Sequence, residues 1–163
     1  MLIRLKNKDT LIVDSFKFKC CIGKNGIKKK KLEGDKSTPR GTFEFGTLYF
    51  RKDRVKKPLT DLKVKSIKNY MGWCDDPNNK LYNKEVKINK KIKYEKLFRL
   101  DHNYDYFLVI KYNTKKIIKN KGSAIFIHLT NNYKPTAGCI ALKKKDFLIF
   151  LKLIKINTKI KIN

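Results

Sequence analysis

The segment IFIHLTNNYKPTAGCIAL, residues 125–142, contains one of the two histidines and one of the four cysteines in this chain of 163 residues. Gly138 directly precedes Cys139, and His128 lies on the same short segment. A thiol is mostly protonated at neutral pH, so a nearby imidazole activates it as a base or as an ion-pair partner. The same imidazole can then protonate a leaving amine. The pair therefore predicts acyl transfer through a thioester.

Each of these residues also has a purely structural interpretation. A lone strand histidine is often half-buried, and a free cysteine often behaves as a small buried hydrophobe. The turn Pro135–Gly138 changes the balance, because glycine lets the backbone adopt an unusual conformation and present N–H groups to an oxyanion. An apolar run and a helix follow and would hold this turn. The combination favours a nucleophile, Cys139, and its base, His128.

Short alternating apolar patterns that predict strands cover most of the chain. The expected strands lie in residues 1–22 (a hairpin turning at 7–9), 42–50, 106–113, 123–129 and 157–163. One helix is expected at 143–154, with its apolar face formed by Phe147, Phe150, Leu151 and Ile154. Residues 23–41 read as a loop. We therefore predict a mainly β fold in a single domain spanning residues 1–163.

Two middle segments, MGWCDDPNNKLYNK and LFRLDHNYDYF, place aromatic and charged residues between turn formers. Segments of that composition are typical of surface loops that build sites. They hold Trp73, Asp75, Asp76, Tyr82, Arg99 and His102. Asp75–Asp76–Pro77 is also compatible with a plain turn, and Asp101–His102 with a loop cap.

The formal charge of +27 first suggests a nucleic-acid partner. However, the basic residues are 36 Lys and only 5 Arg, and the chain has 18 Ile and 14 Asn against 3 Ala. That bias is expected from AT-rich codons, whereas base and phosphate recognition favours arginine. We expect no specific nucleic-acid binding, although a basic module for nucleic acid or another anionic polymer stays open as an alternative.

The cysteines at 20, 21, 74 and 139 form no C-x-x-C pair, which fits a reducing compartment without disulfides. A zinc site built from Cys74, His102, His128 and Cys139 would lack the usual ligand spacing, so we expect no metal and no cofactor. No apolar run reaches the length of a signal peptide or a membrane helix. We expect a cytoplasmic protein without a transmembrane segment, or a periplasmic one if a longer precursor was trimmed.

Three ordered motifs resemble those of the L,D-transpeptidase catalytic domain, the YkuD family of peptidoglycan enzymes. They are T-P-R-G-T-F at 38–43, the strand histidine, and T-A-G-C at 136–139. The resemblance spans nearly the whole chain and implies a β-sandwich-like fold with a helix after the catalytic cysteine. It implies Cys139 as nucleophile, His128 as base, and the Leu129 carbonyl as orienter of the imidazole. Backbone amides at Gly138 and Cys139 would form the oxyanion hole.

The substrate implied by the resemblance is a peptidoglycan stem peptide or muropeptide, from which terminal D-alanine is released. The chain departs from many members by having Ala137 before the glycine and Ala141 after the cysteine. Other side chains must then hold the substrate: Arg40, Arg99 or a lysine a carboxylate, and Asp75 or Asp76 an ammonium, with Trp73 and Tyr82 as walls. The full set expected to contact substrate is Arg40, Trp73, Asp75, Asp76, Tyr82, Arg99, His102 and Thr136. The motifs serve transpeptidation and L,D-carboxypeptidase hydrolysis equally, because both share the first half-reaction.

Overall fold

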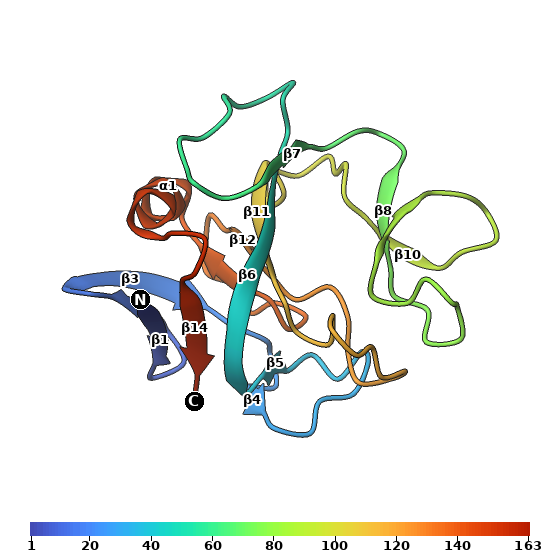
Figure 1. The fold of residues 1–163 in the computed structure, drawn as a ribbon, viewed down its shortest axis with the longest axis horizontal. Coiled ribbons are helices and arrows are strands. Elements are labelled where there is room, and N and C mark those ends of the chain that lie inside the picture. The colour runs from blue at the N-terminus through green and yellow to red at the C-terminus, as the bar shows by residue number, and fades with distance from the viewer.

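The computed structural model describes all residues from 1 to 163 and is mainly β, as predicted (Figure 1). The strands are β1 (Leu2–Lys6), β2 (Thr10–Val13), β3 (Phe16–Cys21), β4 (Ile27–Lys28), β5 (Thr38–Pro39), β6 (Gly41–Phe50), β7 (Val64–Ser66), β8 (Met71–Cys74), β9 (Glu85–Lys87), β10 (Tyr94–Lys96), β11 (Tyr106–Ile110), β12 (Phe126–Leu129), β13 (Ile140–Leu142) and β14 (Lys159–Ile162). The single helix, α1 (Lys144–Leu153), follows the cysteine as predicted.

The main sheet closes on itself around the long strand β6. Its order is β11-β12-β13-β3-β2-β1-β14-β6-β7, and β11 also pairs with β6. Strands β12 and β13 are parallel neighbours, with His128 opposite Ala141. Cys139 immediately precedes β13. The parallel pairing therefore brings the cysteine and the histidine to adjacent strands, although ten residues separate them in the chain.

A core of 25 buried side chains fills the interior of this sheet under α1. The helix contributes Phe147, Phe150 and Leu151, three of the four residues expected on its apolar face, and Ile154 is buried just beyond its last turn. Phe150 meets the ring of Phe18 edge-on, at a centroid distance of 6.5 Å. Burial of such side chains stabilises a domain by roughly 1.5–3 kcal/mol each. This core fixes the strands that carry the site.

The middle of the chain forms β-strands where surface loops were expected, which corrects that prediction. Strands β8, β9 and β10 form a separate three-stranded sheet, and all four residues of β8 are buried. These strands are only three or four residues long, so they are too short for an alternation of apolar and polar residues to reveal them in the sequence. In Figure 1 they lie at one side of the main sheet, on the side opposite α1. The loop expected at 23–41 is largely present, with β4 and β5 as two short paired segments.

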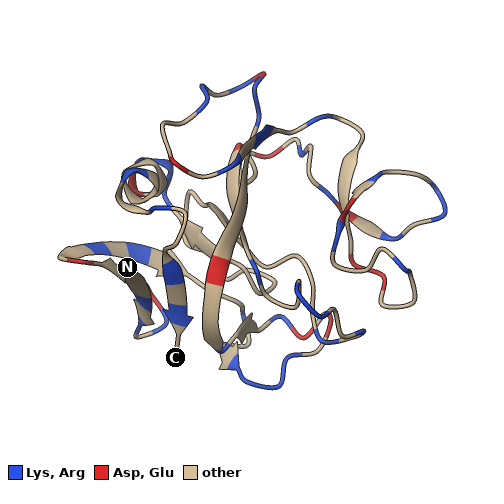
Figure 2. Ribbon diagram, in the orientation of Figure 1, with Lys and Arg blue, Asp and Glu red and all other residues tan.

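Lysine and arginine residues are spread over strands, helix and loops (Figure 2). They alternate with buried residues along β1 and β14, where exposed and buried positions follow one another. No helix has the length and apolar character that crossing a membrane requires.

Candidate active site

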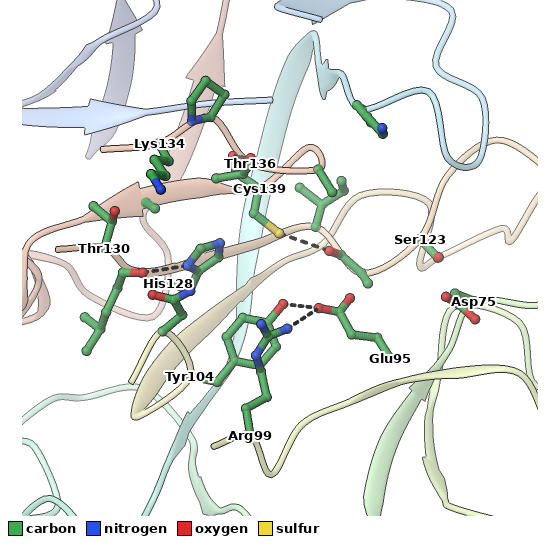
Figure 3. A pocket seen from close by; sticks show the side chains of 18 of the residues that line it. Asp75, Glu95, Arg99, Tyr104, Ser123, His128, Thr130, Lys134, Thr136 and Cys139 are labelled. Carbon is green, nitrogen blue, oxygen red and sulfur yellow. Dashed lines mark hydrogen bonds and ion pairs between the residues drawn. The ribbon is translucent and has the colours of Figure 1, made fainter. Parts of the chain in front are cut away.

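One cavity of about 590 Å³ is lined by both Cys139 and His128 (Figure 3). Its walls come from five parts of the chain: the loop between β4 and β5, Asp75 directly after β8, the β10–β11 region, β12 with the segment entering it, and the turn before β13. Seven of the lining residues carry hydrophobic side chains, and most of the others are polar or charged. The cavity is therefore suited to a polar, charged ligand.

The Cys139 side chain is only 8% exposed and faces this cavity. Its thiol donates to the carbonyl oxygen of Ala124, with Sγ and O 3.2 Å apart, and the N–H of Phe126 donates to the sulfur at 3.3 Å. Burial raises the pKa of the Cys139 thiol to about 12, and the negative charge of Glu95 acts in the same direction. The thiol is thus protonated at neutral pH in the free protein.

The imidazole of His128 is held in one orientation by the backbone. Its Nδ1 lies 2.8 Å from the carbonyl oxygen of Leu129, the contact that the resemblance implies. A carbonyl only accepts, so Nδ1 carries the proton and Nε2 is left free to act as a base. Figure 3 shows the ring beside Cys139. Burial, with a smaller contribution from the charge of Arg99, lowers the pKa of His128 to about 4, so the imidazole is neutral at pH 7.

The turn before the cysteine is closed by the side chain of Thr136. Its hydroxyl donates to the Cys139 carbonyl at 2.6 Å and accepts from the Gly138 N–H at 3.1 Å. The Gly138 amide is therefore engaged, which leaves the Cys139 N–H as the donor from this turn for an oxyanion. Gly138 has a φ of +140°, and a Cβ there would lie 2.7 Å from the carbonyl oxygen of Ser37. Only glycine fits this position.

The T-P-R-G motif supports the cysteine turn through the side chain of Thr38. This fully buried side chain accepts from the Gly23 N–H at 2.9 Å and donates to the Gly138 carbonyl at 2.9 Å. The hydroxyl ties β5 to the cysteine turn, one hundred residues away in sequence. Sequence reasoning matched the motif but did not give it this function.

Asn83 is a second anchor that sequence reasoning missed. Its side-chain oxygen accepts from the Ala124 N–H at 3.1 Å and from Trp73 Nε1 at 3.0 Å, while its amide nitrogen donates to two backbone carbonyls, those of Tyr112 and Asn113. Ala124 has a positive φ of +52°, a strained conformation for a residue with a Cβ. The hydrogen bond from the Ala124 N–H to Asn83 holds Ala124 in this conformation. The carbonyl oxygen of Ala124 in turn accepts the hydrogen bond from the Cys139 thiol. Asparagines in turns are common, so the sequence carries no distinctive signal for this one.

The wall facing Cys139 and His128 is a connected group of Tyr104, Glu95 and Arg99. The Tyr104 hydroxyl donates to Glu95, and the tyrosine ring packs edge-on against His128 at a centroid distance of 5.4 Å. Arg99 lies over the same ring at 4.8 Å and pairs with Asp101 at 2.6 Å. Burial raises the pKa of Glu95, so this carboxyl holds its proton more strongly than an exposed glutamate does.

One end of the cavity is acidic. Figure 3 shows Glu95, Asp75 and Ser123 on one side of Cys139, away from Thr130 and Lys134, and Glu33 also lines the cavity. Oxygen atoms of Asp75 and Ser123 are buried without a hydrogen-bond partner. Burial raises the pKa of Asp75, and the charge of Glu33 adds to this effect. Unpaired buried oxygens beside several carboxyl groups are suited to a cationic group.

The structure brings together about half of the residues that the sequence predicted for the site. The cavity is lined by Cys139, His128, Leu129, Thr136, Asp75 and Arg99. Gly138 shapes the turn behind the cysteine. Five other predicted residues are absent from its lining: Arg40, Trp73, Asp76, Tyr82 and His102.

Two of these five residues are buried supports. Trp73 donates to Asn83 and meets the ring of Phe126 edge-on, so it lies behind the cavity wall. Tyr82 is 2% exposed, and its hydroxyl contacts Glu33 and accepts from the Gly122 N–H at 3.0 Å. Their aromatic rings fill space under the loops, which corrects their expected role as walls against the substrate.

The other three residues are turned to solvent or to local partners. Arg40 is exposed next to β6. Asp76 accepts from the Asn78 N–H at 2.9 Å, as in the plain turn considered above. His102 is 68% exposed and pairs through Nδ1 with Asp105 at 2.7 Å. The residues of the hypothetical zinc set do not converge, and no group of three or more His, Cys, Asp or Glu side chains is placed to hold a metal.

Comparison with protein families gives a match to YkuD, the L,D-transpeptidase catalytic domain, over residues 2–162. The chain therefore belongs to this family, as its three motifs indicated, and it is a peptidoglycan-directed enzyme of the L,D-transpeptidase class. A search of curated proteins found no match.

Proposed function

We propose that this protein is a cysteine acyl-transfer enzyme that cleaves the bond before the terminal D-alanine of a stem tetrapeptide through a Cys139 thioester. The observation that carries the proposal is the pairing in one cavity of a buried thiol with a neutral imidazole whose Nδ1 is fixed on a carbonyl. This arrangement leaves Nε2 as the basic atom on the cavity side. General-base activation of a thiol needs such a free basic nitrogen in the same cavity.

In the first half-reaction, the Cys139 sulfur attacks the carbonyl carbon of the third residue of the stem peptide. The thiol proton moves to Nε2 of His128 as the sulfur–carbon bond forms. The Cys139 N–H stabilises the negative oxygen of the tetrahedral intermediate. The carbon–nitrogen bond then breaks, the imidazolium gives its proton to the leaving nitrogen, and D-alanine departs with a complete amino group.

In the second half-reaction, His128 removes a proton from the nucleophile that attacks the thioester. Water gives the tripeptide acid and free thiol, which is L,D-carboxypeptidase activity. An amine gives a new amide bond, which is transpeptidation or D-amino-acid exchange. Both outcomes use the same residues, so the access of the acceptor decides between them.

The acidic end of the cavity supports a substrate with a cationic group near the scissile bond. Asp75 lines this end, as the sequence predicted for an ammonium partner, and Glu95 and Ser123 lie beside it (Figure 3). Asp76, the second carboxylate predicted for this role, points into its own turn. A diamino acid at the third position of the stem peptide supplies such an ammonium.

The test is incubation of the purified protein with a stem tetrapeptide ending in D-alanine, alone and with a second D-amino acid. Intact-protein and product mass spectrometry would follow the thioester and the products. Tripeptide release that is lost in Cys139→Ala and retained in Cys74→Ala, a buried cysteine outside the cavity, supports the proposal. Incorporation of the added amino acid marks transferase capacity, and tripeptide alone marks a carboxypeptidase.

Absence of both adduct and product from the folded wild-type protein would contradict the proposal. The alternative, a basic module that binds an anionic polymer, predicts binding that falls steeply with salt and survives Cys139→Ala. A salt titration of both proteins against such a polymer separates the two functions.

A further inference from the structure

Lys31 is an unusual residue in the loop between β4 and β5. Its neighbours Lys29 and Lys30 are exposed, whereas Lys31 is only 3% exposed and lines the cavity. Four cations line the cavity, namely Lys31, Lys36, Arg99 and Lys134. Lys31 is the only one of them that is buried. Burying an ammonium is costly, and lysine is rarely found so deep unless it is paired.

We propose that Lys31 binds the terminal carboxylate of the amino acid that leaves, and thereby makes the enzyme selective for a free C-terminus. This inference rests on the proposed function and adds a specificity-determining residue to it. The motif match does not assign a role to Lys31.

The ammonium of Lys31 is fixed by Asp35. Nζ lies 2.7 Å from Asp35 Oδ1, and the same carboxylate accepts from the Leu32 N–H at 3.0 Å and from the N–H and hydroxyl of Ser37 at 2.9 and 2.7 Å. Burial opposes the charged form of Asp35, but the Lys31 contact and these other hydrogen bonds hold its pKa well below the ordinary value. The Asp35 carboxylate is therefore ionised at neutral pH and holds Nζ of Lys31 in place.

This pairing leaves donor capacity on the ammonium. Nζ carries three N–H groups, and its partners within the protein are Asp35 Oδ1 and, at the long distance of 3.4 Å, the Leu32 carbonyl. A substrate carboxylate is the strongest acceptor for the N–H group of Lys31 that has no partner within the protein.

The position of Lys31 relative to the nucleophile fits this role. A Cβ built on Gly138 would lie 3.6 Å from Nζ of Lys31, so the ammonium adjoins the turn that carries Cys139. A Cβ on Gly122 would lie 2.8 Å from Cε, so the glycine leaves room for the lysine stem. The carboxylate of a C-terminal residue is three bonds from the scissile carbonyl carbon. Substrate bonded to the sulfur therefore places that carboxylate within reach of this side of the turn.

The test compares two substrates, the stem tetrapeptide with a free terminal carboxylate and the same peptide with a terminal amide. Steady-state kinetics would be measured for the wild type, for Lys31→Gln, and for Lys30→Gln as an exposed control on the same loop. We expect the wild type and the control to prefer the free acid by roughly tenfold to a hundredfold in kcat/KM, the range for a hydrogen bond to a charged group. Lys31→Gln should lose that preference by acting more slowly on the acid alone.

Equal use of acid and amide by the wild type would overturn the inference, and so would an unchanged preference in Lys31→Gln. A role of Lys31 in loop structure alone would slow both substrates equally. If Lys31→Gln does not fold, Lys31→Arg keeps the charge opposite Asp35 and should change KM for the acid without changing it for the amide. An equal change for both would also overturn the inference. If the wild type cleaves neither peptide, the proposed function itself fails.

Discussion

The protein has two hydrophobic clusters of different character. The larger one, of 25 residues, lies inside the closed sheet under α1 and is mostly aliphatic, with few polar atoms. The smaller one, of 11 residues, lies between the main sheet and the β8–β10 sheet and includes Cys139 among several aromatic rings. The proposed nucleophile thus belongs to the smaller cluster.

The aromatic rings of the smaller cluster have polar tips with defined partners. Tyr49 donates to Glu85 at 2.6 Å, Trp73 donates to Asn83 at 3.0 Å, and Tyr104 donates to Glu95. Apolar burial is non-directional, whereas hydrogen bonds fix orientation. The larger cluster therefore stabilises the fold, while the smaller one positions Cys139 and the side chains around it.

The largest effect is expected from Cys139→Ala. Loss of the nucleophile should lower kcat by about 10⁴-fold or more. The change in unfolding free energy should be small, about 1 kcal/mol, because only one sulfur is removed. Peptide turnover and urea denaturation of the same preparation would measure both quantities. Residual turnover near the wild-type level would exclude the thioester mechanism.

The opposite pattern is expected from Phe150→Ala in the larger cluster. This fully buried ring contacts Phe18 and Phe45, so its removal should cost about 3–5 kcal/mol of unfolding free energy. Activity per folded molecule should be unchanged. Phe16→Ala, at a ring that is 46% exposed, is the matched control and should cost much less. A large loss of kcat in folded Phe150→Ala would contradict the division between the two clusters.

A smaller effect is expected on thiol reactivity in Glu95→Gln. The Glu95 charge raises the pKa of Cys139, so removing it should lower that pKa and increase the thiolate fraction at a given pH. Alkylation of Cys139 by iodoacetamide at pH 8, followed by mass spectrometry, should become several-fold faster, as a pKa decrease of less than one unit implies. Glu44→Gln, a carboxyl outside the cavity that pairs with Lys111, should leave the rate unchanged. A slower reaction in Glu95→Gln would show that the charge acts in the opposite direction.

The smallest effect concerns the pH profile of kcat/KM. Because burial lowers the pKa of His128 to about 4, the base stays neutral well below pH 6. The acid limb of the profile should have its midpoint near pH 4 instead of near 6.5, the ordinary value for histidine. Arg99 contributes to this lowering, so Arg99→Gln should move the midpoint upward by a fraction of a unit. A wild-type midpoint at 6.5 would indicate that the imidazole is solvated in the active form.

Much of the fold was predictable from the sequence where patterns were long or ordered. The first hairpin, the strand at residues 41–50, the helix with Phe147 and Phe150, and the final strand all match their patterns. The β8–β10 sheet was missed, because its strands span three or four residues each and their burial comes from tertiary contacts. Trp73 and Tyr82 were expected in loops against the substrate for the same reason.

The sequence by itself determined the family, since its motifs are local and require particular residue types in order, and those motifs predict Cys139 as nucleophile and His128 as base. Only the tertiary structure decided which charges share the cavity. It turned Asp76 and His102 toward local partners, brought Glu95 and Lys31 to the site, and engaged the Gly138 amide with Thr136. These contacts depend on the pairing of strands far apart in the chain and on the packing of loops between them. Neither is encoded in the spacing of residues along one segment.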